Sequence, residues 1–132
     1  MKILKHVILI PVYNDWKSLN KLLVEVDKSL KNIKNFNTEI LILNDKSTEK
    51  YYISKNNFLS IRKISILTLK KNLGSQKAIA AGLNYLKKSK NKFFVTIMDA
   101  DGEDNPKEIE KMLNLAVEYE NCVITSNRKK RQ

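Results

Sequence analysis

The sequence predicts an α/β fold, a doubly wound and mainly parallel sheet with helices on both faces. Two observations support this fold class. Short runs rich in β-branched and apolar residues alternate with segments of helical periodicity. Several of these runs are nearly continuous in apolar residues, as expected for strands covered on both faces. Because strands and helices alternate, right-handed crossovers should join parallel neighbours.

Five strands are expected, at residues 6–12, 39–44, 64–69, 92–98 and 122–127. A first helix is expected where apolar residues recur at helical spacing, at Trp16, Leu19, Leu22, Leu23, Val26 and Leu30. Another helix should cover 75–87. The segment 47–61 is expected to hold one short helix, capped by Ser47, and a loop.

The last expected helix has an apolar stripe and a clear start. Its stripe consists of Ile109, Met112, Leu113 and Ala116. Asn105 is placed as the N-cap, Pro106 lies in the first turn, and Glu108 follows three residues after the cap. These signals are typical of a helix that begins at Pro106.

The length and composition indicate one domain, residues 1–132. The 42% hydrophobic and 30% charged content is typical of a soluble globular protein. No apolar run reaches about 18 residues, so no transmembrane helix is predicted. The N-terminal run is read as a first strand rather than a signal peptide because it lacks a small-residue cleavage site. The single cysteine, Cys122, excludes an intrachain disulfide, fits a cytoplasmic protein and is expected in the core.

The formal net charge of +11 favours anionic partners such as nucleotides or phospholipid headgroups. The lysines are spread from Lys2 to Lys130. No basic stripe with interleaved aromatic residues and no zinc-ligand spacing is present, so nucleic acid is not expected as a partner. A solvated lysine-rich surface is the simplest account of the charge. Peripheral association with the inner face of a membrane is the functional alternative.

Polar clusters follow the first four expected strands. They read "YND", "NDKS", "KKNLGS" and "DADGED" in chain order. In parallel α/β sheets, ligands bind beyond the carboxyl ends of the strands. Because four strand ends carry such clusters, we expect a binding site at this edge of the sheet.

The acidic cluster after the fourth strand is suited to a hard cation. Asp99 and Asp101 could share one site, one directed at a metal and the other at a ligand hydroxyl, and Glu103 could add a third oxygen. Such oxygens together with a diphosphate suit Mg²⁺ or Mn²⁺. A polar turn in which Asp104 and Asn105 cap the next helix is the structural alternative, and we adopt it for those two residues.

The other clusters suggest a nucleotide. Gly74 precedes a helix whose N-terminus would favour phosphate, although neither a P-loop nor a dinucleotide-binding motif is present. Lys77 either lies near that phosphate or is simply solvated. Asp45 could accept hydrogen bonds from a base or ribose. Tyr13 could flank a base or cover the sheet edge.

Four blocks of the sequence resemble family 2 glycosyltransferases in order and spacing. They are "IPVYND" (10–15), "LILNDKST" (41–48), "NLGSQKAIAAGL" (72–83) and "IMDADGEDNP" (97–106). The resemblance covers essentially the whole chain and implies an inverting enzyme with a GT-A-type nucleotide-sugar fold. Within the family, "DADGEDNP" with "TSNRKKR" is most similar to the dolichol- or polyprenyl-phosphate mannosyl- and glucosyltransferases.

The resemblance also implies roles for individual residues. It assigns nucleotide-sugar binding to Pro11, Tyr13, Asp15, Asp45, Asp99 and Arg128, with Arg128 at the diphosphate. Gly74, Lys77 and Ala100 complete the predicted nucleotide-sugar site. It assigns the divalent metal to Asp99, Asp101 and Glu103. The sequence departs from the family where Asn44 and Lys46 replace the usual Asp and Gly, so the second turn is expected to differ in shape. No catalytic base is assigned.

The resemblance predicts sugar transfer from a nucleotide-diphosphate donor to an acceptor, a polyprenyl phosphate or a glycan. Because family catalytic domains usually continue well beyond this length, the chain is expected to be their N-terminal, donor-binding half. A nucleotide-sugar-binding module without independent turnover is therefore the alternative, and self-association through an exposed sheet edge is expected. A third reading is a haloacid-dehalogenase-like phosphatase, because "DADG" resembles the D-x-D nucleophile loop of that family. In that family, however, the loop normally follows the first strand.

Overall fold

The computed structural model describes residues 2–54, 56–119 and 121–125. They form a four-stranded sheet with strand order β3-β2-β1-β4, in which every pairing is parallel. The strands are β1 (Leu4–Val12), β2 (Phe36–Asn44), β3 (Ile61–Thr68) and β4 (Phe94–Ile97). The predicted α/β class with a mainly parallel sheet is confirmed.

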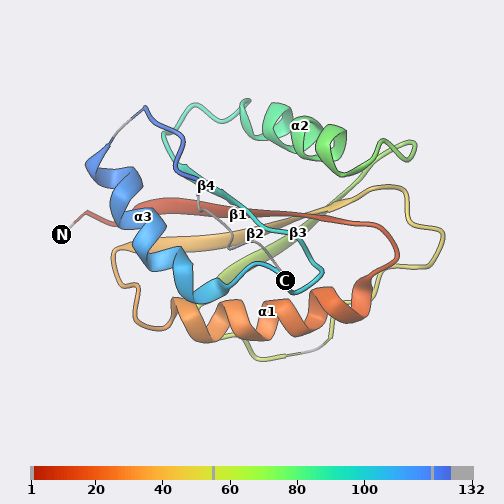
Figure 1. Ribbon diagram of the computed structural model, residues 1–132, viewed down its shortest axis with the longest axis horizontal. Helices are drawn as coiled ribbons and strands as arrows, with labels where there is room; N and C mark the ends of the chain where they lie inside the picture. The colour runs from red at the N-terminus through yellow and green to blue at the C-terminus, as the bar shows by residue number, and fades with distance from the viewer. Residues whose placement is uncertain (1, 55, 120, 126–132) are drawn as a thin grey trace, which may run out of the picture.

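Three α-helices cover the two faces of the sheet, as Figure 1 shows. They are α1 (Trp16–Leu30), α2 (Ser75–Leu86) and α3 (Ile109–Glu118), and the short 3₁₀ helix η1 (Pro106–Glu108) leads into α3. α1 and α3 lie on one face and α2 lies on the other. The doubly wound arrangement follows, because the β1–β2 crossover through α1 and the β3–β4 crossover through α2 lie on opposite faces.

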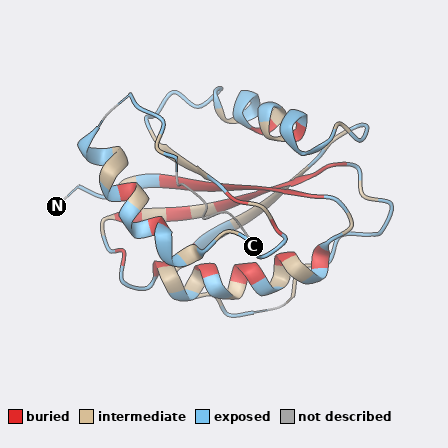
Figure 2. Cartoon of the chain, in the orientation of Figure 1, coloured by how far each residue is buried: buried red, intermediate tan, exposed pale blue. Residues whose placement is uncertain are grey.

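The central strand β1 carries the core on both of its faces. Ile8 and Ile10 point to the side of α1 and α3, whereas Val7 and Leu9 point to the side of α2. All four side chains are buried, as the continuous buried stretch in Figure 2 indicates. This explains why the strand is apolar at successive positions rather than alternating.

α2 lies very close to the sheet at Gly82. A Cβ atom at this position would lie 2.7 Å from Leu43 Cδ1 and 2.9 Å from Leu9 Cδ1. The neighbouring contact residue, Ala78, is fully buried. Small residues on this face of α2 therefore set the distance between helix and sheet.

The segment between β2 and β3 contains no helix in its described residues, 45–54 and 56–60, so the expected short helix is wrong. Polar side chains of α1 hold this segment instead. Asn20 Oδ1 accepts the Ser54 N–H at 2.7 Å. The Asp27 carboxylate accepts the backbone N–H groups of Leu59, Ser60 and Ile61. These bonds satisfy the backbone without secondary structure.

A buried polar row crosses three strands. His6 in β1 is fully buried, and its Nδ1 lies 2.9 Å from Thr38 Oγ1 in β2. Its Nε2 lies 2.7 Å from Thr96 Oγ1 in β4. Burial disfavours the charged imidazolium and lowers the pKa of His6 to about 4. The histidine is therefore neutral at physiological pH, and we assign it no role at the site.

The expected fifth strand is not formed where the chain is described. Residues 122–125 have no strand pairing, and 126 and 127 lie outside the described residues. Cys122 is exposed rather than in the core, because no strand carries it into the sheet. β4 is one edge strand of the four-stranded sheet, and its Ile97 is 46% exposed. Among the described residues, no helix combines the length and apolarity needed to cross a membrane.

Candidate functional site at the carboxyl ends of the strands

The carboxyl ends of β1, β2 and β4 lie at one edge of the sheet because all pairings are parallel. Val12 pairs with Asn44 at the end of β1 and β2, and the Asp45 N–H donates to Val12 O at 2.9 Å. On the other side of β1, the Met98 N–H donates to Leu9 O at 3.0 Å. The loops after these three strands therefore leave from the same edge, which we call the rim.

The loop after β1 presents two side chains to solvent at the rim. Tyr13 is 49% exposed, and Asp15 is exposed at the N-cap position of α1. The Asp15 side chain makes no capping hydrogen bond, so its carboxylate is not used by the helix. Pro11 is buried in β1 and shapes the strand end rather than offering a large accessible surface.

Asn14 joins the loops after β1 and β2, a role that the sequence did not reveal. Its backbone has φ +60°, and its N–H donates to Ser47 Oγ at 2.9 Å. Its side chain donates to Thr48 Oγ1 and accepts the Glu49 N–H, both at 2.9 Å. Asparagine tolerates this left-handed conformation better than most residues, which was the available signal. Ser47, expected to cap a helix, instead takes part in this bridge.

Asp45 is buried, with 3% of its surface exposed, and its carboxylate holds the segment before α2. Oδ1 accepts the Leu73 N–H at 2.8 Å, and Oδ2 accepts the Gly74 N–H at 2.9 Å. Asn72 Nδ2 donates to the Asp45 carbonyl oxygen at 3.0 Å. The carboxylate that the resemblance assigns to the nucleotide is thus engaged with two backbone amides of this chain.

The turn after β2 contains a left-handed residue, Lys46. Lys46 has φ +56°, a conformation that glycine adopts without strain and that costs other residues about 1–2 kcal/mol. The buried Asn44 supports the turn, because its Oδ1 accepts the Ser47 N–H at 3.0 Å. Lysine at position 46 therefore adopts the backbone that the family's usual glycine would favour.

α2 begins at the rim directly after Gly74. Gly74 has φ +86° and ψ 157° and occupies the N-cap position, with no side-chain cap. A Cβ atom added there would meet nothing within 4 Å, so the surrounding space is open. Lys77, in the first turn of α2, is exposed. The end of a helix and an exposed lysine thus lie on the same open part of the rim.

The acidic segment after β4 folds into a compact turn. The Asp99 N–H donates to Asp104 Oδ2 at 2.8 Å, and the Glu103 N–H donates to Asp101 Oδ1 at 2.9 Å. Gly102 between them has φ +84°. Asp104 therefore closes the turn rather than capping the next helix.

The flanking residues complete this turn. Asn105 is the N-cap of η1, and its side chain accepts the Lys107 N–H at 3.1 Å, as predicted. Ala100 is buried between the two aspartates, whereas Asp99 is half-buried and Asp101 and Glu103 are exposed. The turn thus exposes carboxylates at the rim while the alanine anchors it to the core.

These acids do not form a three-carboxylate cage. Within the described part of the chain, no three His, Cys, Asp or Glu side chains are grouped so as to hold a metal ion. Mg²⁺ usually takes one or two carboxylates, substrate phosphates and water rather than an all-protein cage. The hard oxygens of the half-buried Asp99 and the exposed Asp101 fit that mode of binding. Arg128, expected at the diphosphate, lies outside the described residues.

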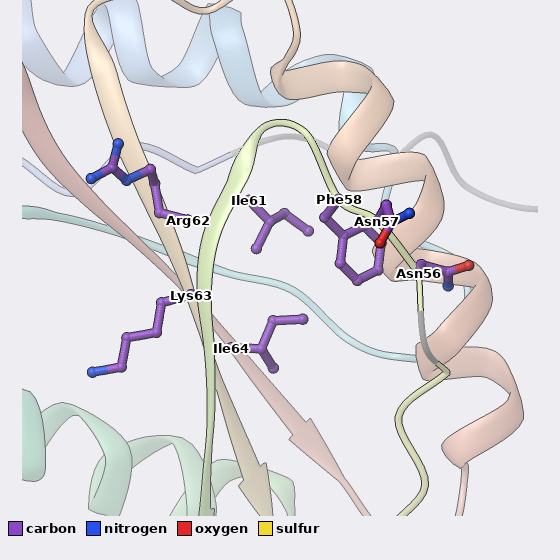
Figure 3. Close-up of a pocket in the computed structure, with 7 residues that line it drawn as sticks. All are labelled: Asn56, Asn57, Phe58, Ile61, Arg62, Lys63 and Ile64. Carbon is purple, nitrogen blue, oxygen red and sulfur yellow. The ribbon is translucent and has the colours of Figure 1, made fainter.

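An open pocket of about 410 Å³ lies elsewhere, at the amino end of β3 (Figure 3). Phe58, Ile61 and Ile64 form its apolar part, whereas Arg62 and Lys63 point away from them in Figure 3. β3 begins at Ile61 and reaches the rim only at Thr68. The pocket is therefore at the opposite end of the strand from the candidate site, and it offers no convergent catalytic groups.

The chain belongs to glycosyl transferase family 2, because the model of that family matches residues 7–132. The parallel sheet with helices on both faces is the GT-A-type fold of this family. A search among curated proteins found no match. Family membership supports a role in glycosyl transfer and places the four sequence blocks in a common fold.

Proposed function

We propose that the rim binds a nucleotide-diphosphate sugar and that the protein is a metal-dependent, inverting glycosyltransferase. Family 2 membership supports the reaction class. The main observation that supports the site is that three strand ends and the start of α2 meet at one edge of the sheet. Hydrogen bonds of Asp45 and Asn14 join the loops there. Residues 1–132 act as the donor-binding domain in this proposal.

The nucleoside would lie against the loop after β1. Tyr13 offers an exposed ring on which a base can stack, and Asp15 has a solvent-facing carboxylate that can accept a hydrogen bond from a base or ribose. Pro11 shapes the floor of this region. Asp45 would act indirectly, because its carboxylate holds the backbone of Leu73 and Gly74 in place at the start of α2.

The diphosphate would lie between the start of α2 and the acidic turn. The open space at Gly74 allows close approach to the backbone, and the helix end and Lys77 favour negative charge. Asp99 and Asp101 would hold Mg²⁺ or Mn²⁺, with Glu103 beside them. The bound cation would neutralise charge on the departing diphosphate. Arg128 is proposed as a bidentate donor to the same group.

The acceptor is proposed to be a polyprenyl phosphate, with a glycan as the alternative. The resemblance of "DADGEDNP" and "TSNRKKR" to the dolichol- and polyprenyl-phosphate branch supports this choice. In-line attack on the anomeric carbon requires an acceptor held in orientation. We therefore propose that donor binding resides in this chain, and that transfer depends on how an acceptor is presented to the rim.

Isothermal titration calorimetry with UDP, GDP and their sugars, with and without Mn²⁺, tests donor binding. Tyr13→Ala should weaken nucleotide binding about 10-fold or more, because base–aromatic stacking contributes on the order of 1–3 kcal/mol. Tyr119→Ala is the matched control, because Tyr119 is similarly exposed but follows α3. Equal effects of the two changes, or no binding of any nucleotide in Mn²⁺, would contradict the proposed site.

Incubation with labelled nucleotide sugars and polyprenyl phosphate then separates the enzyme from a binding module. Metal-dependent transfer supports the enzyme, whereas tight nucleotide binding without transfer supports a module that needs a partner chain. The phosphatase reading is disfavoured because "DADG" follows β4 rather than the first strand. Hydrolysis of p-nitrophenyl phosphate that depends on Asp99 would support it instead.

A further inference from the structure

The net positive charge of the chain is concentrated in one continuous part of the sequence. Residues 50–98 contain 11 lysine or arginine residues and no aspartate or glutamate. This equals the formal net charge of +11 for the whole chain, so the remaining residues carry as many acids as bases, 14 of each. The lysines are spread along the sequence, but the carboxylates are excluded from this segment.

From residue 61 onward this segment forms β3, α2 and β4, whereas its described residues between 54 and 60 lie along α1 on the other face. Among the described elements, α2 is the helix that covers its face of the sheet (Figure 1). We call this side the α2 face. The exposed lysines that flank α2 or extend from it are Lys70, Lys71, Lys77, Lys87, Lys88 and Lys90.

Two lysines on strands continue this surface. Lys5 on β1 lies over the Phe93 ring at 5.6 Å, and Phe93 packs on the α2 side of the sheet. Lys63 points toward α2 in Figure 3. Glu39, which pairs with Lys63 in register, is the half-buried acid of β2 on this side. The α2 face is therefore strongly cationic.

The opposite face, covered by α1 and α3, has mixed charge. α1 carries Glu25 and Asp27 among its lysines, and Lys28 Nζ lies 3.6 Å from Glu25 Oε1. α3 carries Glu110 and Glu118. A uniformly solvated lysine-rich exterior would not differ in this way between faces. The asymmetry points to a partner that meets the molecule from the α2 side.

The side chains on the α2 face suit a lipid surface better than nucleic acid. The cations are lysines, whereas base and phosphate recognition in nucleic acids favours the planar fork of arginine. α2 also exposes two apolar side chains, Leu83 at 40% and Tyr85 at 49%. Tyrosine is enriched at membrane interfaces, and lysine side chains can reach the charged headgroups there.

We propose that the α2 face docks on an anionic phospholipid bilayer. Lysines near the surface supply the electrostatic attraction, and the exposed Tyr85 reaches the headgroup region. α2 begins beside Gly74, so the docking face and the rim share one helix. The docking itself does not depend on the proposed reaction, and its test requires neither nucleotide nor sugar.

Vesicle co-sedimentation of the purified chain tests this docking. The protein should bind vesicles of equal parts phosphatidylcholine and phosphatidylserine at about 0.15 M salt, and bind phosphatidylcholine alone weakly. Changing Lys87, Lys88 and Lys90 together to Glu should lower the anionic partition coefficient at least about 10-fold. Tyr85→Ser should lower it further.

A triple variant on the other face is the matched control. Lys17, Lys21 and Lys31 are exposed lysines of α1 and its C-cap, and changing them to Glu alters the net charge equally. We expect this control to lower binding by less than about 3-fold, because those lysines face away from the bilayer. Circular dichroism of both variants checks that the fold is retained.

Three results would overturn the proposal. Equal losses in the two triple variants would show a general charge effect without a docking face. Absence of binding to anionic vesicles at this salt concentration would exclude docking. Tighter binding of a single-stranded RNA oligonucleotide than of the vesicles, lost in the α2-face variant, would identify a nucleic-acid surface.

Discussion

The carboxylate of Asp45 accepts the backbone N–H of Gly74, with 2.9 Å between Oδ2 and the nitrogen. Its other oxygen accepts the N–H of Leu73 at 2.8 Å. The bond pair ties the end of β2 to the start of α2, two elements that border the rim. Because Asp45 is almost fully buried, these amides are also what compensates the carboxylate for lost hydration.

Asp45→Asn should destabilise the protein by about 1–3 kcal/mol, because the asparagine amide can accept only through one atom and would set an N–H donor against a backbone N–H. Urea denaturation followed by circular dichroism measures this loss. Nucleotide affinity should fall as well, since the start of α2 would no longer be held.

Asp15→Asn is the control for this change. Asp15 is exposed and makes no capping bond, so its free energy of unfolding should change by less than about 0.5 kcal/mol. If Asp45→Asn were as stable as the wild type but bound nucleotide poorly, the carboxylate would be a ligand contact rather than a structural clamp.

Gly74→Ala should lower the free energy of unfolding by about 1–3 kcal/mol through backbone strain alone. The φ and ψ of Gly74 lie in a region that is accessible essentially only to glycine, and its Cβ would meet no neighbour. Gly82→Ala provides the contrast, because its Cβ would clash with Leu43. Thermal and urea denaturation of both single variants gives the two costs.

A double-mutant cycle with Leu43→Ala separates these mechanisms. Truncation of Leu43 should couple favourably with Gly82→Ala, because it removes the two closest clashing atoms and leaves only Leu9 Cδ1 of the three nearest. It should be additive with Gly74→Ala. Coupling of similar size in both cycles would show that the strain at Gly74 is not local.

The strongly periodic elements were predictable from sequence. The apolar stripe of α1 gave the helix at Trp16–Leu30, and the continuous apolar run gave β1. The β-rich run at 122–127 was not a reliable guide, since residues 122–125 have no strand neighbour in the described sheet. A strand depends on a pairing partner, whereas a helix satisfies its own backbone.

The meeting of the strand ends at one edge was predictable, but the bonding of the residues there was not. Parallel strands alone place the segments after β1, β2 and β4 at one edge. The hydrogen bonds of Asp45 depend on where Leu73 and Gly74 lie, nearly thirty positions away in sequence. The hydrogen bond between Asn14 and Ser47 likewise joins residues that are far apart in sequence. Contacts between loops depend on tertiary structure, so local patterns do not reveal them.

Asp101→Asn should weaken binding of a nucleotide diphosphate in Mn²⁺ by about 1–3 kcal/mol, while leaving the weak binding without metal nearly unchanged. The reason is that an exposed carboxylate at the rim is proposed to hold the cation and not the nucleotide itself. Calorimetry with and without Mn²⁺ gives both affinities. Equal metal-dependent affinity in the variant and the wild type would exclude Asp101 as a ligand.

Glu118→Gln is the control for this variant, because it removes one carboxylate of α3, which is not placed at the rim. It should leave both affinities unchanged. A loss as large as that of Asp101→Asn would indicate a general charge effect on nucleotide binding.

The stability of the protein should fall as pH drops below about 6.5, because His6 is buried in its neutral form. Its pKa is lowered from 6.5 to about 4 in the folded chain, so between these values the unfolded chain binds a proton that the folded chain does not. The contribution is fully present above pH 6.5 and is lost as the pH falls toward 4. From pH 7 to pH 5 it amounts to about 2 kcal/mol.

Two measurements check this prediction. His6 is the only histidine in the chain, so its ring signals in an NMR titration report the pKa directly. Urea denaturation at pH 7 and pH 5 gives the stability change, and His6→Gln, which keeps a donor and an acceptor for Thr38 and Thr96, should remove about 2 kcal/mol of it. A ring that titrates near 6.5, or a variant with the same pH dependence as the wild type, would show that the buried row does not hold a neutral histidine.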